Sequence, residues 1–184
     1  MRTLISAIAL SLAGTASGVS LVHAVQFADG TVAFEKSPRL VEARTTFKSA
    51  GAWGSEYYFT VELPEEAGEP LQTITFELRQ GIDDIRFLLD ETFAFVGTTD
   101  GDREPIAVQS ATLDEATETI AVDFASPVPP GTTFTVALKP RRNPDLGGIY
   151  LFGVTAFPAG ENPYGLYLGP GRLQFYRNND RFFN

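Results

Sequence analysis

Three carboxylates lie close together near the middle of the chain. Asp100, Asp102 and Glu104 alternate with Gly101 and Arg103. Oxygen ligands at this spacing suit Ca2+, which takes several carboxylate and carbonyl oxygens. The full pattern of a calcium-binding loop is absent, and Asp and Gly also favour a solvated turn. The segment therefore predicts either a calcium site made by these three carboxylates or a polar turn. Ca2+ is the one cofactor that the sequence suggests.

A second group of polar side chains surrounds Pro140. Lys139, Arg141, Arg142 and Asn143 follow one another there. A planar guanidinium group binds carboxylate, sulfate or phosphate through two parallel hydrogen bonds. The same side chains would also solvate a loop and pair with acidic strands. We take these four residues as candidate binding residues for an anionic ligand.

Two aromatic residues stand on turn-forming sequence. Trp53 lies between Gly51 and Gly54, and Tyr164 ends the loop segment 161–164. Rings with an apolar body and a polar tip favour contact with sugar rings and with partner proteins. For Trp53 the alternative is packing against the edge of a sheet. Binding residues are often found on loops held by a rigid scaffold. We expect a functional surface where these loops and the basic group share one end of the fold.

Several acidic residues are neighbours in the sequence, at Glu65-Glu66, Asp83-Asp84, Asp90-Glu91 and Asp114-Glu115. Glycoside hydrolysis needs two carboxylates that face each other across a cleft. Neighbouring residues on a strand point to opposite faces of the sheet. We interpret these pairs as surface or turn residues rather than as catalytic acids.

The N-terminal segment has the pattern of a secretory signal. Arg2 precedes the apolar stretch Leu4–Leu12, and Val22-His23-Ala24 matches the small-residue pattern before a cleavage point. We expect cleavage after Ala24. This divides the chain into a signal peptide, residues 1–24, and one exported domain, residues 25–184, in the periplasm or outside the cell. An uncleaved anchor helix is the alternative, although Gly and Ser residues after the apolar stretch argue against it.

Cleavage after Ala24 would limit the chemistry of the exported domain. The only His is His23, the only Met is Met1, and the chain has no Cys. Catalysis by Ser–His or Cys–His pairs would then be excluded, as would zinc or copper sites built on imidazole or sulfur. Carboxylate chemistry, oxygen-ligated cations and Lys or Tyr chemistry would remain, and without a supporting motif for any of them we predict a protein that is not an enzyme. Its formal net charge of -9 argues against a nucleic-acid partner.

The dominant hydrophobic period is two residues, which is typical of antiparallel sheets. It is clear in Tyr57–Leu63, Thr73–Arg79, Thr119–Phe124 and Thr133–Lys139. Turn signals separate such segments, among them Asp29-Gly30 and a four-residue loop at Asp114–Thr117. We predict an all-β protein, an antiparallel β-sandwich with immunoglobulin-like architecture and nine or ten short strands. At most one short helical turn is expected, within Pro64–Leu71.

The segment Ile149–Phe157 is apolar on both faces. Such a strand is expected to be central and covered on both sides. The covering element could be the segment Gly165–Gly171. The alternative is an exposed face that contacts another protein.

Three segments carry a resemblance to a known family. They are YYFTVELPEEAGEPLQTITF, PVPPGTTFTVALKPRRNP, and YLFGVTAFPAGENP with the following LYLGPGRLQFYR. With them the chain resembles a cyanobacterial family of exported proteins of unknown function, over roughly Tyr57 to Arg177. The resemblance implies an exported β-rich protein. It implies no activity, and it supplies no catalytic residues.

The leading hypothesis is an exported, non-enzymatic module that binds an envelope component, such as a glycan, or a protein partner. One alternative is a structural envelope protein without a discrete ligand. The other is a glycan-active protein that depends on calcium or on carboxylates.

Overall fold

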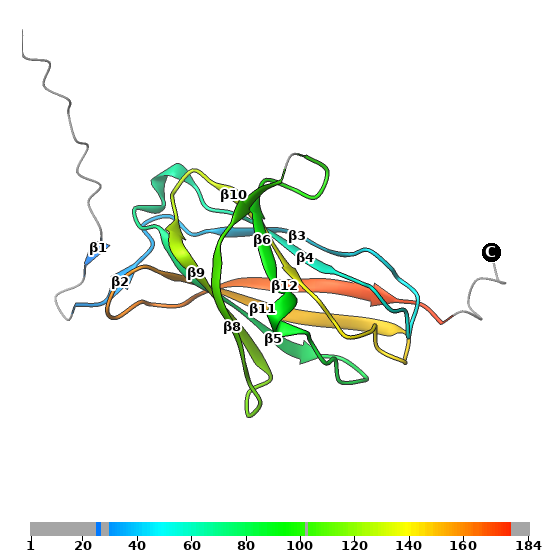
Figure 1. The fold of residues 1–184 in the computed structure, drawn as a ribbon. Coiled ribbons are helices and arrows are strands. Elements are labelled where there is room, and N and C mark those ends of the chain that lie inside the picture. The colour runs from blue at the N-terminus through cyan, green and yellow to red at the C-terminus, as the bar shows by residue number, and fades with distance from the viewer. Residues whose placement is uncertain (1–24, 27–29, 102, 178–184) are drawn as a thin grey trace, which may run out of the picture.

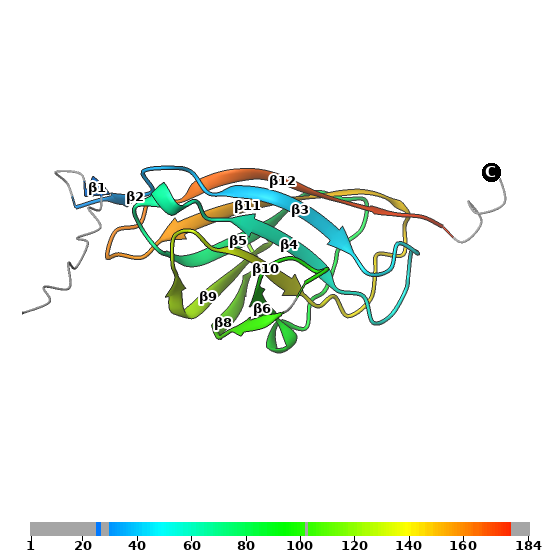
Figure 2. The same ribbon diagram turned by 90° about the horizontal axis from the view of Figure 1, so that it is seen from above.

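The computed structural model describes residues 25–26, 30–101 and 103–177. A short hairpin pairs β1 (Val25–Gln26) with β2 (Val32–Ala33). This agrees with the hairpin predicted around Asp29-Gly30, although residues 27–29 lie outside the described part. The remaining strands form two antiparallel sheets of five strands each. Figures 1 and 2 show these sheets as two facing layers.

The first sheet has the strand order β3-β4-β10-β6-β7. Its strands are β3 (Arg39–Thr45), β4 (Tyr57–Glu62), β10 (Thr133–Leu138), β6 (Phe93–Val96) and β7 (Glu104–Ile106). The second sheet has the order β12-β11-β5-β9-β8. Its strands are β12 (Leu166–Phe175), β11 (Gly148–Pro158), β5 (Leu71–Gln80), β9 (Thr119–Val128) and β8 (Val108–Asp114). The predicted antiparallel β-sandwich is confirmed.

Aromatic side chains join the two layers. Phe59 of β4 meets Phe76 of β5 with 4.7 Å between the ring centroids. Phe124 of β9 and Phe134 of β10 meet edge to face at 5.6 Å. All four rings are fully buried. They come from the alternating segments that the sequence predicts as strands, so the period of two does identify the core-facing residues.

The two sides of the sandwich are closed differently. On one side the chain passes from β7 in the first sheet to β8 in the second through the single residue Ala107. On the other side β3 and β12 lie side by side, as Figure 2 shows. There Gly171 is so close that an added Cβ would lie 2.7 Å from the Phe59 ring. No local pattern in the sequence marks this change of sheet.

Three local predictions need correction. Two short 3-10 turns occur in the described chain, η1 (Glu65–Ala67), as predicted, and η2 (Leu89–Glu91), where at most one turn was expected. Gly165–Gly171 does not cover β11, since it belongs to β12 and pairs beside it in the same sheet. The outer face of β11 is partly open, and Ile149 there is 39% exposed.

Tyr58 and Thr60 lie on the outer face of β4, yet both are buried. Loop residues 97–101 and 103 lie over this face. The Thr60 and Thr135 hydroxyls share a hydrogen bond of 2.9 Å, and Thr135 donates to the carbonyl of Gly97 at 2.7 Å. Tertiary contact with this loop therefore removes a face from water that alternation alone assigns to solvent.

Candidate functional site

Five loops gather at one end of the sandwich, which we call the Trp53 end. They are the segments 46–56, 81–92, 115–118 and 139–147 and the start of the segment after β12. The registers of β4, β10, β11 and β12 bring these loops to the same end. The loop that carries Tyr164 joins the opposite ends of β11 and β12. Trp53 and the basic segment therefore share an end, and Tyr164 is not with them.

The Trp53 loop is fixed by its backbone. Gly51 and Gly54 have φ of 68° and 73°, in the left-handed region that glycine adopts readily. The amide of Gly51 donates to the carbonyl of Pro144 at 2.8 Å, and the amide of Asn143 donates to the carbonyl of Ala52 at 2.8 Å. These two bonds attach the residues just before Trp53 to the basic segment.

Asn143 was predicted as an exposed binding residue, and the structure places it in the interior instead. It is 1% exposed. Its amide nitrogen donates to the carbonyls of Phe47 and Ser49 at 2.8 and 2.9 Å, and its oxygen accepts from Tyr57 at 3.0 Å. A buried polar side chain with all these partners holds the loop in place, and its hydrogen-bonding groups are used within the protein.

A cleft of about 480 Å³ opens beside Trp53. Its lining residues are Trp53, Asp83, Asp84, Arg86, Arg141, Arg142, Asn143, Pro144 and Asp145. Trp53 is 66% exposed, so its indole face is available for contact. Of the two alternatives for Trp53, the structure therefore favours the exposed contact over packing against a sheet edge.

Arg86 and Arg141 are brought together by backbone pairing. The amide of Arg141 donates to the carbonyl of Arg86 at 2.8 Å, and the amide of Leu88 donates to the carbonyl of Lys139 at 2.8 Å. Phe87 and Pro140, which lie between these two bonds, face each other as an isolated antiparallel β-bridge. Both arginines are exposed, and neither forms an ion pair with any residue that the structure describes.

The acidic residues of the cleft are largely engaged. Asp145 forms an ion pair of 2.6 Å with Arg142, and its amide donates to the Asp83 carboxylate at 2.8 Å. Asp84 is the third carboxylate of the lining. Arg86 and Arg141 form no ion pair with these carboxylates, so their guanidinium groups are available in the cleft for an anionic group.

Lys139 lies outside this cleft. Its ammonium group is 3.5 Å from the Glu56 carboxylate, which also accepts a hydrogen bond from the Tyr58 hydroxyl. Burial raises the pKa of Tyr58, and the bond to Glu56 raises it further. These contacts stabilise the outer face of the first sheet. For Lys139 the structure therefore shows ion pairing with an acidic residue, which was the alternative to ligand binding.

Tyr164 is 60% exposed at the end opposite Trp53. It borders a small hollow of about 220 Å³ with Ala33, Phe34, Ser37 and Leu166. Its amide donates to the carbonyl of Val32 at 2.8 Å. This arrangement fixes the backbone of Tyr164, but it joins none of the other predicted binding residues.

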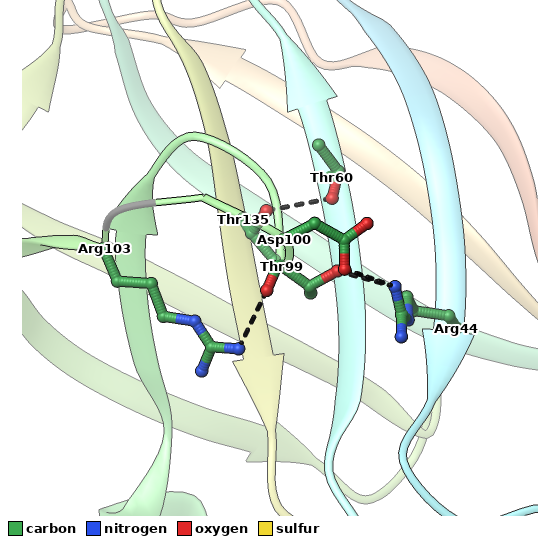
Figure 3. Close-up of polar contacts among 6 residues, drawn as sticks. All are labelled: Arg44, Thr60, Thr99, Asp100, Arg103 and Thr135. Carbon is green, nitrogen blue, oxygen red and sulfur yellow. Dashed lines mark hydrogen bonds and ion pairs between the residues drawn. The ribbon is translucent and has the colours of Figure 1, made fainter.

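The predicted calcium ligands lie near the loop over the first sheet. Asp100 is 3.4 Å from the Arg44 guanidinium group, which also donates to the Thr99 hydroxyl at 2.8 Å (Figure 3). Glu104 begins β7, and Asp102 lies outside the described residues. Among the described residues no group of three acidic or metal-binding side chains could hold a metal ion. A cation at Asp100 would have to compete with Arg44.

Arg103 holds the same loop from its other side. It donates to the carbonyl of Thr99 at 3.1 Å (Figure 3). Its guanidinium group lies over the rings of Phe95 and Tyr58 at 5.0 and 5.7 Å. Cation–π contact of this kind is favourable at distances up to about 6 Å. The loop is therefore a cover for a second, smaller apolar cluster.

Arg86 and Asp83 were missed as site residues from the sequence. Their segment, 81–92, showed only a mixture of helix-forming and strand-forming residues. The bridge between Phe87 and Pro140 places it beside the basic segment, and no local pattern reports a contact between residues so far apart. The adjacent Asp83-Asp84 pair was the one signal, and it was interpreted as surface acid.

Comparison with solved structures finds similar β-sandwiches. The collagen-binding domain of a Staphylococcus aureus adhesin has a TM-score of 0.40 and 12% identity, over 74% of this chain and 97% of that domain. BslA, a bacterial hydrophobin, has a TM-score of 0.42 and 15% identity, over 78% and 96%. ACE19, the collagen-binding subdomain of an Enterococcus faecalis surface protein, has a TM-score of 0.39 and 13% identity, over 72% and 92%.

No curated protein matches the sequence at a significant level. No helix in the described part of the chain is long and apolar enough to span a membrane. A family model described as "Protein of unknown function (DUF2808)" matches residues 31–175, from just before β2 to the end of β12. This match confirms the predicted resemblance in so far as it concerns a family of unknown function, and the chain belongs to the DUF2808 family.

Proposed function

We propose that this protein is a non-enzymatic binding module that recognises an anionic saccharide in the cleft beside Trp53. One observation carries the proposal. A tryptophan that is 66% exposed forms the wall of a cleft that also holds two arginines without an ion-pair partner among the described residues. Export to the cell envelope is part of the proposal, and the pattern of residues 1–24 supports it.

The residue types fit this class of ligand. The face of an indole ring packs against the apolar C–H face of a sugar, and its N–H group is free to donate a hydrogen bond. The guanidinium groups of Arg86 and Arg141 can each hold a carboxylate or sulfate group through two hydrogen bonds. A volume of about 480 Å³ lies within the range typical of small-ligand sites.

The cleft also has the rigidity that a binding site needs. Backbone bonds from Gly51 and Asn143 fix the Trp53 loop against the basic segment. The bond from the Arg141 amide fixes that segment against residue Arg86. A preorganised site loses less conformational entropy when a ligand binds, so its few contacts yield more affinity. The carboxylates of Asp83 and Asp145 serve in holding these loops, which favours binding over acid catalysis.

The test is calorimetric titration with tetragalacturonate, compared with neutral maltotetraose of the same length. Trp53 is the only tryptophan in the chain, so its fluorescence gives a second signal. The protein is expected to bind the uronate and not the neutral sugar. Trp53→Ala and Arg141→Ala should each weaken binding about tenfold or more, which corresponds to about 1.4 kcal/mol.

Two matched variants serve as controls. Tyr164→Ala removes an exposed aromatic side chain at the opposite end, and Arg172→Ala removes an exposed arginine from β12. Both should bind the uronate as the unchanged protein does. The melting temperatures of Trp53→Ala and Arg141→Ala should change little, because both side chains are exposed. Equal weakening by the control variants, or binding of neither sugar, would argue for a structural role without this ligand.

A further inference from the structure

Strand β8 has one edge without a partner strand. In the described chain it pairs with β9 on one side, and on the other it is the last strand of its sheet, with η2 near its first residues and no strand beside it. Figure 1 shows β8 at the front of the sandwich, with the β8–β9 hairpin projecting at the bottom of the view. An unpaired edge presents a row of backbone N–H and C=O groups that can pair with another chain.

Two hollows follow this edge, one after the other. The first, of about 590 Å³, has the lining residues Phe87, Leu88, Leu89, Asp90, Thr92 and Val108–Ala111. The second, of about 540 Å³, has the lining residues Phe76, Leu78, Asp84–Phe87, Leu113, Glu115, Glu118, Ile120 and Phe152. Phe87 borders both. Together they make a groove with β8 as one wall and the segment 84–92 as the other, which we call the β8 groove.

The floor of the β8 groove is apolar. Phe76, Ile120 and Phe152 are core residues at 0–2% exposure, and they form the bottom of the second hollow. Leu113 stands on β8 itself and is 45% exposed. Leu113 therefore supplies exposed apolar surface, and covering such surface yields about 25 cal/mol per Å². An apolar side chain placed opposite Leu113 would therefore gain from leaving water.

The polar groups along the groove indicate an occupant with backbone hydrogen-bonding groups and basic side chains. In the first hollow the Thr92 hydroxyl is buried and has no hydrogen-bond partner among the described residues. In the second hollow three carboxylates, of Asp84, Glu115 and Glu118, stand with one arginine, Arg86. The rim near the β8–β9 hairpin is thus acidic, which favours basic side chains in an occupant.

We propose that the β8 groove binds an extended polypeptide of a partner protein as an added antiparallel or parallel strand. The partner pairs its backbone with the free edge of β8. It places an apolar side chain over Leu113, and a lysine or arginine beside Glu115 and Glu118. Strand addition of this type draws affinity from main-chain hydrogen bonds and specificity from alternate side chains. The proposal does not rest on saccharide binding at the Trp53 cleft.

The probe is the labelled heptapeptide acetyl-Lys-Val-Thr-Phe-Thr-Val-Lys amide, with fluorescence anisotropy as the measurement. A version with Glu in place of both Lys residues should bind at least about tenfold more weakly, because its charges are repelled by the acidic rim. Two further versions carry N-methyl groups on one or the other set of alternate residues. The version that loses the N–H groups facing β8 should not bind. Amide hydrogen exchange should slow at β8 when the first peptide binds.

Two variants locate the site. Leu113→Lys places a cation in the apolar groove and is expected to weaken binding of the probe about tenfold or more. Val41→Lys is the matched control, because Val41 is 51% exposed on the edge strand β3, and this variant should bind as the unchanged protein does.

Three outcomes would overturn the proposal. One is equal binding by the parent peptide and both N-methylated versions, since strand pairing would then be absent. Another is protection from exchange at strands other than β8. The third is a concentration-dependent dimer that Leu113→Lys abolishes, because the occupant of the edge would then be a second copy of this chain. Titration of tetragalacturonate into the same samples shows separately whether the Trp53 cleft binds the saccharide.

Discussion

The side-chain oxygen of Asn143 accepts a hydrogen bond of 3.0 Å from the Tyr57 hydroxyl. Tyr57 is fully buried at the start of β4, and Asn143 belongs to the basic segment after β10. The side-chain nitrogen of Asn143 donates hydrogen bonds to the carbonyls of Phe47 and Ser49 in the Trp53 loop. One buried side chain thus joins the core to both loops of the proposed saccharide site.

Replacing Asn143 should therefore destabilise the domain and disturb the cleft together. Asn143→Ala leaves the Tyr57 hydroxyl and two carbonyls without their partner in the interior. The free energy of unfolding is expected to fall by about 2–4 kcal/mol, as measured by urea denaturation. Asn162→Ala is the control, because Asn162 is exposed, its side chain donates only to the Thr31 hydroxyl among the described contacts, and its backbone bond from the Val32 amide is kept, so stability should change little. A stable Asn143→Ala variant would contradict this account.

The stability of the domain should fall in alkaline solution because of Tyr57. Burial raises the pKa of Tyr57, and the neighbouring Tyr150 raises it further. An acid whose pKa is higher in the folded state adds stability below its unfolded pKa, about 10, and loses it as the pH rises further. Thermal melts between pH 8 and pH 11 should show this loss.

The matched variant for this titration is Tyr57→Phe. It lacks the bond to Asn143, so it should be less stable than the unchanged protein near pH 8. It cannot ionise, so its stability should decline less steeply above pH 10. Part of the decline should remain, because burial also raises the pKa of Tyr58 and of Tyr150. Parallel curves for the two proteins would show that Tyr57 does not contribute.

Gly171 is expected to tolerate no side chain. An added Cβ would lie 2.7 Å from the Phe59 ring and 3.0 Å from the Ala43 Cβ, where β12 meets β3 and β4. Gly171→Ala should lower the free energy of unfolding by about 1–3 kcal/mol through overpacking. Gly101→Ala is the control, because nothing lies within 4 Å of its added Cβ. Unfolding of both variants at the same urea concentration would contradict the close packing of β12 against β3 and β4.

Glu118 links backbone strain to the β8 groove. It has φ of 53°, and it is the one residue other than glycine with positive φ among those described. Glu118→Gly should raise the free energy of unfolding by up to about 1 kcal/mol, because glycine adopts this conformation without steric cost. The same change removes a carboxylate from the groove, so the lysine-bearing probe should bind more weakly. Glu115→Gly, without such strain to relieve, should not raise stability.

The sequence by itself determined the layers of this protein. The period of two in Tyr57–Leu63, Thr73–Arg79, Thr119–Phe124 and Thr133–Lys139 identified four core strands and their inward faces. The glycines around Trp53 marked a turn, and the structure confirms their positive φ. These features follow from short-range physics, because alternation and turn conformation depend on residues within a few positions of one another.

Only the tertiary structure decided which residues form the candidate site. Arg86 joins Arg141 through the bridge between Phe87 and Pro140, and Asn143 becomes internal through contacts with Tyr57 and the Trp53 loop. Thr60 leaves water because loop residues 97–101 and 103 cover it. Each of these outcomes depends on segments more than 35 positions apart. No local pattern contains that information, because packing and hydrogen-bond satisfaction are settled only when the whole chain has folded.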